Sequence, residues 1–180
     1  MQVLISYHSD YGNTRKMAEA VAAGYKAADG AAVIDLKLVE MTGLDDLTQA
    51  DVIILGTPVH MGSMAWPVKK LIDEAAKLWM EGALEGKVGG VFATGGGFGG
   101  AGGGVEQTLV SLHSNFLEHG MTVVGFPRSL PGYADGGLQW GPCGRSGSHE
   151  GMPAGLSDGS LVAARSYGAH IAEVAARLID

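Results

Sequence analysis

Short runs of apolar residues alternate along the chain with segments in which apolar residues recur at helical spacing. The runs are nearly continuous, which is typical of strands covered on both faces of a sheet. The segments expected to form strands are residues 3–7, 32–38, 52–56, 87–94 and 121–125. The segments with one apolar helical face are residues 17–28, 67–79, 105–116 and 161–178. This alternation predicts an α/β fold in which a five-stranded parallel sheet carries helices on both faces.

The pattern extends over the whole chain and predicts a single domain over residues 1–180. With 180 residues, the chain is long enough for one sizeable core and short for two. Residues 40–50 leave room for about two helical turns. Residues 126–158 are too long for a plain connection, so we expect a functional loop excursion there.

Three loops of the predicted fold carry unusual residues, and all three follow strands. They are residues 8–14, 57–64 and 94–104. Glycine makes up 30 of the 180 residues and is concentrated at 95–104 and 132–159, where we expect the backbone to approach a ligand closely. Because an open parallel sheet binds ligands beyond the carboxyl ends of its strands, these loops are the expected binding site.

The first loop has the composition of an anion site. Ser9, Tyr11, Asn13 and Thr14 surround Gly12 where a helix is expected to begin, so hydroxyls, backbone N–H groups and the helix dipole converge. No lysine or arginine precedes Thr14 in the loop, which predicts a phosphate monoester held by neutral donors. The loop matches neither a Walker A motif nor Gly-x-Gly-x-x-Gly. The alternative is a plain helix start capped by Asn13 or Thr14.

The second and third loops offer different surfaces. Residues 57–64 mix apolar side chains with backbone donors, against which a flat aromatic ring system fits. The alternative is a plain turn in which Met61 and Met64 only fill space. In residues 94–104 glycine predominates between a buried strand and an amphipathic helix, which indicates close backbone approach to a ligand or a mobile lid rather than a linker.

Charge and cysteine content exclude several classes of partner. The formal net charge of −7 and the scattered basic residues argue against nucleic acid and against anionic membrane surfaces. No apolar run approaches the roughly 18 residues that span a bilayer, and no basic leader precedes the first strand. Cys143 is the only cysteine, which excludes an internal disulfide, and the histidines show no clustering typical of a metal site. We expect a cytoplasmic protein without a bound metal.

Five motifs, in order along the chain, resemble those of a known group of flavoproteins. The polar loop Ser9-x-Tyr11-Gly12-Asn13-Thr14 resembles the FMN phosphate loop of flavodoxins. The other four motifs are Gly56-Thr57-Pro58 with Gly62-Ser63-Met64, Trp79-x-x-Gly82-Ala83-Leu84-x-Gly86-Lys87, Glu106-Gln107-Thr108 and His119-Gly120-Met121. Together they resemble the WrbA-type NAD(P)H:quinone oxidoreductases of the flavodoxin-like superfamily, over about residues 3–178.

The resemblance implies a flavodoxin-like sheet of strand order 2-1-3-4-5, with FMN as cofactor and NADH or NADPH as electron donor. It also implies two-electron hydride transfer to a quinone by a ping-pong mechanism, in a homo-oligomer that is a dimer or a tetramer. Carried over by position, the cofactor-binding residues are Ser9, Asp10, Tyr11, Gly12, Asn13, Thr14, Pro58, Val59, His60, Met61, Gly62, Ser63, Thr94, Gly95, Gly96, Gly97, Gly103, Gly104 and His119.

His119 is also the expected catalytic residue, because the resemblance places it beside the flavin and a histidine can donate a proton to a quinone oxygen at neutral pH. The alternative is a histidine that only interacts with the C-terminal dipole of a helix. Trp79, Phe98 and Trp140 are the expected substrate-pocket residues. The resemblance implies that Trp79 closes the pocket from a neighbouring subunit; otherwise it covers core or surface. Trp140 either lines the pocket or packs the excursion down.

The sequence departs from the family pattern at three places. The glycine tract at 95–104 is longer than usual and the segment 40–50 lacks a common insertion, which bears on oligomer contacts and pocket shape. Pro142-Cys143-Gly144 stands where an aromatic residue usually lies between proline and glycine, which bears on the substrate.

The alternative function is that of an electron-carrier flavodoxin with no substrate of its own. Carriers usually shield the flavin between aromatic residues of the two ring-binding loops, whereas here residues 57–64 have none and residues 94–104 have only Phe98. The sequence therefore favours an open flavin face and a hydride-using enzyme. An interaction protein that has lost the cofactor is a third possibility, against which the intact phosphate loop speaks. No basic cluster marks a 2′-phosphate site, so the choice between NADH and NADPH stays open.

Overall fold

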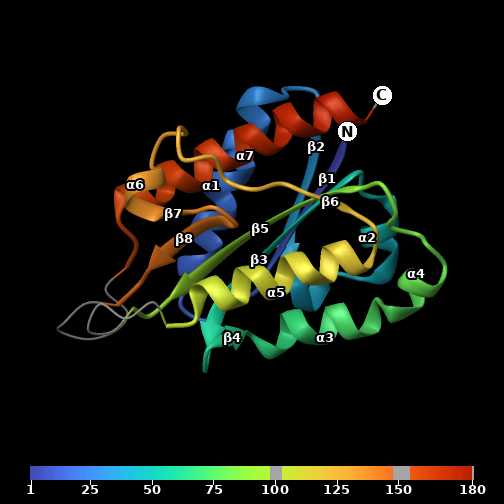
Figure 1. The fold of residues 1–180 in the computed structure, drawn as a ribbon, viewed down its shortest axis with the longest axis horizontal. Coiled ribbons are helices and arrows are strands. Elements are labelled where there is room, and N and C mark those ends of the chain that lie inside the picture. Colours follow the sequence, from blue (N-terminus) through green and yellow to red (C-terminus); the bar gives the residue numbers. More distant parts are fainter. Residues whose placement is uncertain (98–102, 148–154, 180) are drawn as a thin grey trace.

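The computed structural model describes residues 1–97, 103–147 and 155–179. Its centre is a twisted sheet whose strands run in parallel in the order β2-β1-β3-β5, followed by an edge position (Figure 1). These strands are β1 (Gln2–Tyr7), β2 (Val33–Leu38), β3 (Val52–His60) and β5 (Val88–Gly95). The flavodoxin-like fold with the expected parallel order is confirmed in this part of the chain.

The fifth position of the sheet is divided between two short strands. They are β6 (Thr122–Val123) and β8 (Gly141–Arg145). The first pairs with the start of β5 and the second with its end, both in parallel. The single fifth strand expected over residues 121–125 is therefore too long, and the expected excursion at 126–158 is partly wrong, because it returns to the sheet as β8. A strand that reads Gly-Pro-Cys-Gly-Arg has no apolar pattern by which it can be found.

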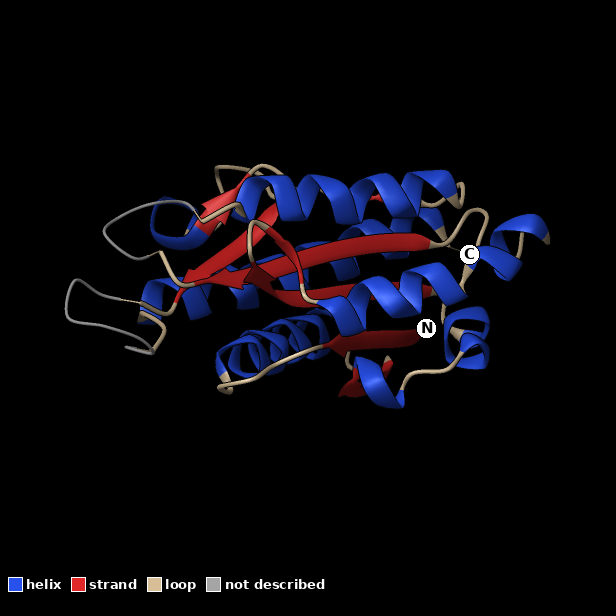
Figure 2. Ribbon diagram, turned by 90° about the horizontal axis from the view of Figure 1, so that it is seen from below, coloured by secondary structure: helices blue, strands red, loops and turns tan. Residues whose placement is uncertain are grey.

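Helices cover both faces of the sheet, as expected (Figure 2). One face is covered by α1 (Asn13–Ala28) and α7 (Asp158–Leu178). The other face is covered by α3 (Trp66–Glu74) and α5 (Val105–Glu118), with the short helices α2 (Leu44–Gln49) and α4 (Ala76–Met80) nearby. Side chains of β1 alternate between the two cores, with Ile5 facing α1 and α7 and Leu4 facing the other layer.

The helices α1 and α7 touch each other through their backbones. A Cβ atom on Gly168 would lie 2.1 Å from the carbonyl oxygen of Val21, and one on Gly24 would lie 1.8 Å from that of Arg165. Only glycine allows this approach, and it fixes how closely the C-terminal helix lies against the helix that follows β1.

The gap between β6 and β8 is filled by a side chain from α7. The Tyr167 hydroxyl accepts a hydrogen bond from Val91 N–H of β5 at 3.3 Å and donates one to the carbonyl of Val124 at 2.6 Å. Tyr167 is fully buried, so its hydroxyl replaces the backbone partners that a continuous fifth strand would supply.

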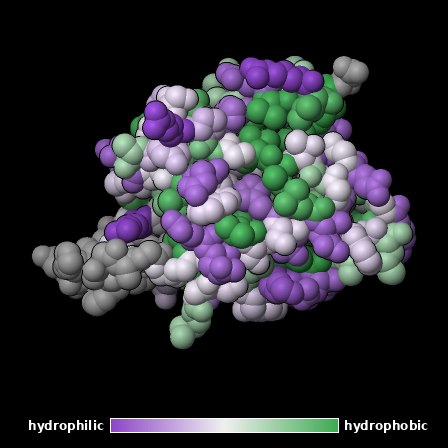
Figure 3. Space-filling view, viewed as in Figure 1, coloured by the Kyte–Doolittle hydropathy of each residue, from purple (hydrophilic) through white to green (hydrophobic). Residues whose placement is uncertain are grey.

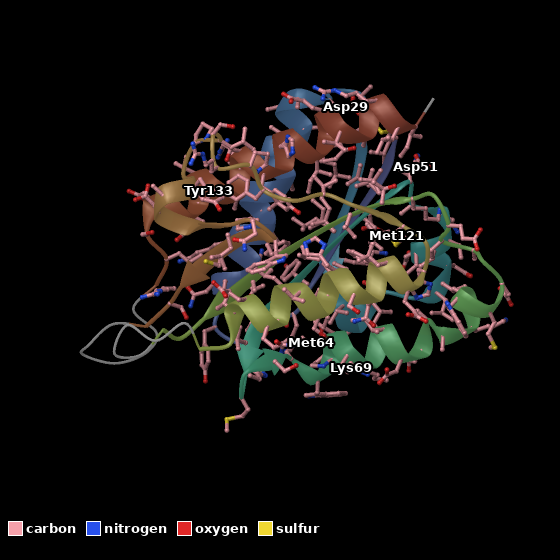
Figure 4. All side chains as sticks on the ribbon, in the orientation of Figure 1. Asp29, Asp51, Met64, Lys69, Met121 and Tyr133 are labelled. Carbon is pink, nitrogen blue, oxygen red and sulfur yellow. The ribbon has the colours of Figure 1, made fainter. Side chains whose placement is uncertain are left out.

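The middle of the excursion folds back over the α1 and α7 layer. It contains α6 (Tyr133–Gly136) and β7 (Gly137–Leu138), which pairs with β8 in an antiparallel hairpin. Tyr133, labelled in Figure 4, stacks on Phe126, whose ring also contacts Tyr167. Tyr133 therefore packs the excursion down onto the core. In the described ranges no helix is long and apolar enough to cross a membrane.

Candidate functional site

The three predicted loops meet in one small cleft at the carboxyl ends of β1, β3 and β5. The cleft has a volume of about 70 Å³. Its lining is Ser9, Asp10, Tyr11, Asn13, Thr14, Pro58, Val59, His60, Thr94, Gly95, Gly96 and Ser146. Residues from segments far apart in the sequence thus surround one open space.

The first loop leaves the beginning of α1 open toward this cleft. The helix begins after Gly12, whose φ of +82° is a left-handed conformation that glycine adopts without strain. No described side chain caps the helix at this position, so the alternative of a start capped by Asn13 or Thr14 does not hold. The Ser9 hydroxyl instead accepts a hydrogen bond from the backbone N–H of Arg15, at 3.3 Å. The first-turn N–H groups that no side chain accepts and the helix dipole favour an anion here.

A buried pair of hydroxyls joins the first loop to β5. Thr14 Oγ1 and Thr94 Oγ1 lie 2.7 Å apart, and both residues are almost fully buried. Each hydroxyl can donate to only one partner, so one of the two stays free to donate into the cleft.

The second predicted loop is a β-hairpin rather than an irregular loop. The strand β3 continues to His60, turns at Met61 and Gly62, and returns as β4 (Ser63–Met64). Both turn residues have positive φ, +49° and +85°, which suits the twist of a two-residue hairpin. Met61 is fully exposed at the tip, whereas Met64 is buried in the core below, so only Met64 fills space there.

The third loop comes against the tip of this hairpin. A Cβ atom on Gly104 would lie 2.6 Å from Cα of Gly62, and Gly104 has a φ of +86°. The close backbone approach expected of the glycine tract is therefore made, in the described part, to the hairpin. Gly103 and Gly104 lead directly into α5. Phe98 lies outside the described residues.

Ser146 completes the cleft and was not among the predicted residues. Its backbone N–H donates to the carbonyl of Gly95 at 2.9 Å, which continues the pairing of β8 with β5. Ser146 reaches the cleft because β8 lies beside the carboxyl end of β5. Since β8 has no sequence signature, Ser146 had none either.

Asp10 is held between two histidines at the rim of the cleft. Its Oδ1 lies 3.2 Å from Nε2 of His8, and its Oδ2 lies 3.0 Å from Nε2 of His60. Nδ1 of His8 lies 2.5 Å from Oε1 of Glu40. Partial burial raises the pKa of the Asp10 carboxyl, but the hydrogen bonds and charges of His8 and His60 outweigh burial and lower the pKa below its ordinary value.

A single chain does not bring His119 or Trp79 to the cleft. His119 follows α5 at the end of the sheet where strands begin, since Thr122 pairs there with Val88 at the start of β5. Trp79 lies on α4. In Figure 1 this helix is at the end of the sheet where the strands begin, on the other side of the molecule from β4 and the carboxyl end of β5. Within one chain His119 therefore lies away from the cleft, because the helix that follows β5 ends near the start of the strands.

His119 has apolar surroundings at this end of the sheet. It borders a small cavity together with Leu55 and Phe116, and its Nδ1 atom is buried without a hydrogen-bond partner in the described ranges. Burial lowers the pKa of His119, although nearby Glu118 opposes this. The uncharged form of the imidazole is favoured in one isolated chain.

Trp140 and Cys143 border a separate cavity between α5 and β8. This cavity has a volume of about 530 Å³ and is also bordered by Glu106 and Arg145. The carbonyl of Trp140 accepts a hydrogen bond from the imidazole of His113, and this contact joins the excursion to α5. Burial raises the pKa of the Cys143 thiol, so the thiol form is favoured at neutral pH.

The donors around the cleft fit a phosphate monoester attached to a flat ring system. The cleft combines hydroxyls, first-turn N–H groups and the glycine backbone after β5 with the apolar side chains of Pro58 and Val59. Across residues 1–97, 103–147 and 155–179, no group of three His, Cys, Asp or Glu side chains is arranged to hold a metal ion. The site is thus suited to bind an organic phosphate.

The comparisons with known proteins identify the family and the fold. Residues 5–140 match the flavodoxin family. The chain belongs to that family. Among solved structures, the flavodoxin described as a WrbA-like protein from Agrobacterium tumefaciens superposes with a TM-score of 0.72 at 30% identity, covering 98% of both chains. A flavodoxin from the domain Archaea superposes with a TM-score of 0.69 at 24% identity, which supports the fold alone.

Two curated relatives of this flavodoxin carry the name NAD(P)H dehydrogenase (quinone). The protein from Syntrophobacter fumaroxidans is 34% identical over 209 aligned positions, covering 99% of this chain and 98% of the relative. The protein from Geotalea uraniireducens is 35% identical over 207 positions, covering 99% of each. The similarity therefore extends over both the described sheet and the segments that form the cleft.

Proposed function

We propose that this flavodoxin-family protein is an FMN-dependent NAD(P)H:quinone oxidoreductase. The observation that carries the proposal is the open start of α1 beside the paired hydroxyls of Thr14 and Thr94, which suits the phosphate of FMN rather than a nucleotide triphosphate. The names of the full-length relatives add the activity. When bound, FMN supplies two-electron hydride chemistry between a nicotinamide donor and a quinone, in a ping-pong sequence.

The residues of the chain bind and orient the reactants. Ser9, Tyr11, Asn13 and Thr14 hold the phosphate through hydroxyl, amide and backbone donors. Pro58 and Val59 support the ring system, and backbone N–H groups of the glycine loop stabilise negative charge at the ring edge. The hairpin carries no aromatic side chain, and its Met61 points into solvent. One ring face is thereby left open for the nicotinamide and then for the quinone.

Roles for His119 and Trp79 require a second copy of the chain. Both lie at the end of the sheet where the strands begin, and Trp79 and Met80 on α4 are half or more exposed there. A further groove of about 310 Å³, bordered by Val110 and Leu117, runs along α5, and hydrophobic residues reach the surface between α5 and α7 in Figure 3. Such surfaces suit a homo-oligomer, a dimer or tetramer, in which one chain completes the quinone pocket of another.

Cytoplasmic location stays a prediction from the single unpaired cysteine. Cys143 is half-buried, and its thiol has no described partner with which to form a disulfide. A protein with one such thiol fits a reducing compartment. Its location is tested by fractionating cells that express a tagged chain.

The second candidate is an electron-carrier flavodoxin. The fold does not exclude this function, since the archaeal flavodoxin has the same fold. The hairpin argues against it, because the loop that covers one ring face in a carrier would here present Met61 and Ser63 instead of an aromatic ring.

The cofactor proposal is tested by removing hydroxyls from the phosphate loop. The variant Ser9→Ala with Thr14→Ala should lose at least about tenfold in affinity for FMN while binding riboflavin nearly as well as the wild type. The control Thr48→Ala removes a hydroxyl on α2, away from the cleft, and should change neither affinity. Equal losses for FMN and riboflavin would contradict the phosphate assignment.

The activity proposal is tested by initial rates with both substrates varied. NADH or NADPH oxidation should depend on benzoquinone, and double-reciprocal plots should give parallel lines, the pattern of a ping-pong mechanism. Intersecting lines would contradict the ping-pong sequence, and a lack of turnover would contradict the enzyme.

A further inference from the structure

The phosphate loop contains no lysine or arginine before Thr14, yet FMN brings a doubly charged phosphate group to it. Neutral donors bind phosphates, but a nearby cation adds a favourable charge–charge interaction. The structure places two histidines where the loop lacks a cation. They are His8 and His60, and both contact Asp10.

The contacts come from three separate segments. His8 follows β1, and its backbone N–H donates to the carbonyl of Gly56. Asp10 lies inside the phosphate loop, His60 ends β3, and Glu40 lies in a short 3₁₀ turn, Val39–Met41, after β2. The imidazole rings of His8 and His60 are 6.2 Å apart and nearly perpendicular, with Asp10 bridging them.

The cluster lies at the same cleft as the phosphate donors. Asp10 and His60 line it together with Ser9, Asn13 and Thr14. The Asp10 side chain is about one-third exposed at 36%, and that of His60 is 42% exposed, so both are open to a ligand that enters the cleft. His8 is more enclosed at 16% and links the cluster to Glu40.

The charge of this cluster depends on the histidines. With both histidines neutral, Asp10 and Glu40 leave two negative charges beside the phosphate site, which repel a phosphate dianion. With both histidines protonated, the cluster has no net charge and two donors per ring. Histidine is the side chain that ordinarily makes this change close to neutral pH.

We propose that His8 and His60 supply the positive charge for the FMN phosphate, and that Asp10 and Glu40 are positioning residues that hold the two imidazoles beside the loop. This inference rests on the proposed FMN site. It makes the histidines determinants of FMN over riboflavin, because riboflavin lacks the phosphate. By linkage, FMN must then draw protons onto the cluster when it binds.

Other charged or titratable groups stand on the same elements. In the described ranges those nearest the loop include Tyr7 on β1, Tyr11 in the loop, Arg15 and Lys16 in the first turn of α1, and Lys37 on β2. Arg15 is paired with Glu19, and Lys37 is paired with Asp35 and Asp46. The ion pairs that Asp10 makes in the described ranges are with His8 and His60.

The direct test measures proton uptake on flavin binding. Titration calorimetry at about pH 6.5–7, in buffers with different ionisation enthalpies, gives the number of protons taken up with FMN and with riboflavin. The full-length wild type should take up protons with FMN and none with riboflavin. The variant His8→Gln with His60→Gln should lose the uptake with FMN. The control His170→Gln changes a histidine on α7 and should keep it.

The affinities give a second readout. The ratio of wild-type to variant affinity for FMN should be about three- to tenfold near pH 6 and should fall toward one near pH 8.5, because an uncharged imidazole offers the phosphate no positive charge. It should also shrink in 1 M salt. Taking this ratio cancels the ionisation of the phosphate itself, since both proteins bind the same ligand.

The outcomes separate this inference from the proposed function. A wild type that binds FMN without proton uptake, or a variant whose FMN affinity equals that of the wild type near pH 6, overturns the role of the histidines and leaves the FMN site standing. A wild type that binds neither FMN nor riboflavin overturns the proposed function and the inference together. If the variant loses riboflavin affinity as much as FMN affinity, the histidines hold the loop in shape and the charge role is refuted.

Discussion

The hydroxyl of Tyr167 should stabilise the divided edge of the sheet, and Tyr167→Phe removes that one oxygen. The hydroxyl joins Val91 N–H of β5 to the carbonyl of Val124, across the gap between β6 and β8. Tyr167, Val91 and Val124 are all buried. The substitution therefore leaves a buried donor and a buried acceptor without partners, while the ring still fills the same space.

The expected loss follows from those two groups. A buried polar group that loses its partner costs about 1–3 kcal/mol. Two such groups, with some relief from movement of the excursion, predict a loss of about 2–4 kcal/mol in the free energy of unfolding. For a domain of this size, 1 kcal/mol corresponds to about 2–4 °C in Tm, so Tm should fall by about 4–16 °C.

The assay is thermal and urea unfolding followed by circular dichroism, with Tyr25→Phe as the matched control. Tyr25 is also fully buried, but its hydroxyl contacts only the sulfur of Met1, at 3.7 Å. Its substitution should cost less than about 1 kcal/mol. If Tyr167→Phe is no more destabilising than Tyr25→Phe, the hydroxyl does not replace a strand and the reasoning is refuted.

Two further predictions concern stability. Gly168→Ala should lower the free energy of unfolding by at least about 2 kcal/mol, because the new Cβ meets the backbone oxygen of Val21. The control Gly30→Ala adds a Cβ that meets nothing within 4 Å and should be close to neutral. Equal Tm values for the two variants would refute the contact. The hydrogen bond to Lys37 lowers the pKa of Asp46 below its ordinary 3.8, so Asp46 stabilises the fold above that pH and loses this effect as pH falls through the lowered pKa. Asp46→Asn should therefore be less stable than wild type at pH 7 and converge with it near pH 2; a constant difference across the urea curves at both pH values would refute this.

The regular strands and helices were predictable because each buries an apolar face. The runs at 3–7 and 52–56 lie in the centre of the sheet, where both faces are covered, and the structure confirms them as β1 and β3. The strand β8 was not predictable, since Gly-Pro-Cys-Gly-Arg shows no apolar pattern. Its pairing partner and the Tyr167 bridge appear only once the chain is folded.

The cleft was predictable where local backbone geometry forms it. Gly12 and the hydroxyls around it mark the open start of α1 by their order in the sequence alone. Contacts between distant segments were not predictable, such as Asp10 with His60, which are 50 residues apart. The resemblance gave His119 a role beside the flavin but did not say which subunit's flavin. Because α5 runs away from the cleft, His119 lies far from the cleft of its own chain.

Hydride delivery from a nicotinamide to an open flavin face is tested by anaerobic mixing. The flavin-containing protein is mixed with NADH or NADPH while visible absorbance is followed, and benzoquinone is then added. NAD(P)H should bleach the flavin, and benzoquinone should restore its colour. A flavin that keeps its colour with NADH and NADPH, yet is bleached by a one-electron donor, would identify the protein as an electron carrier instead.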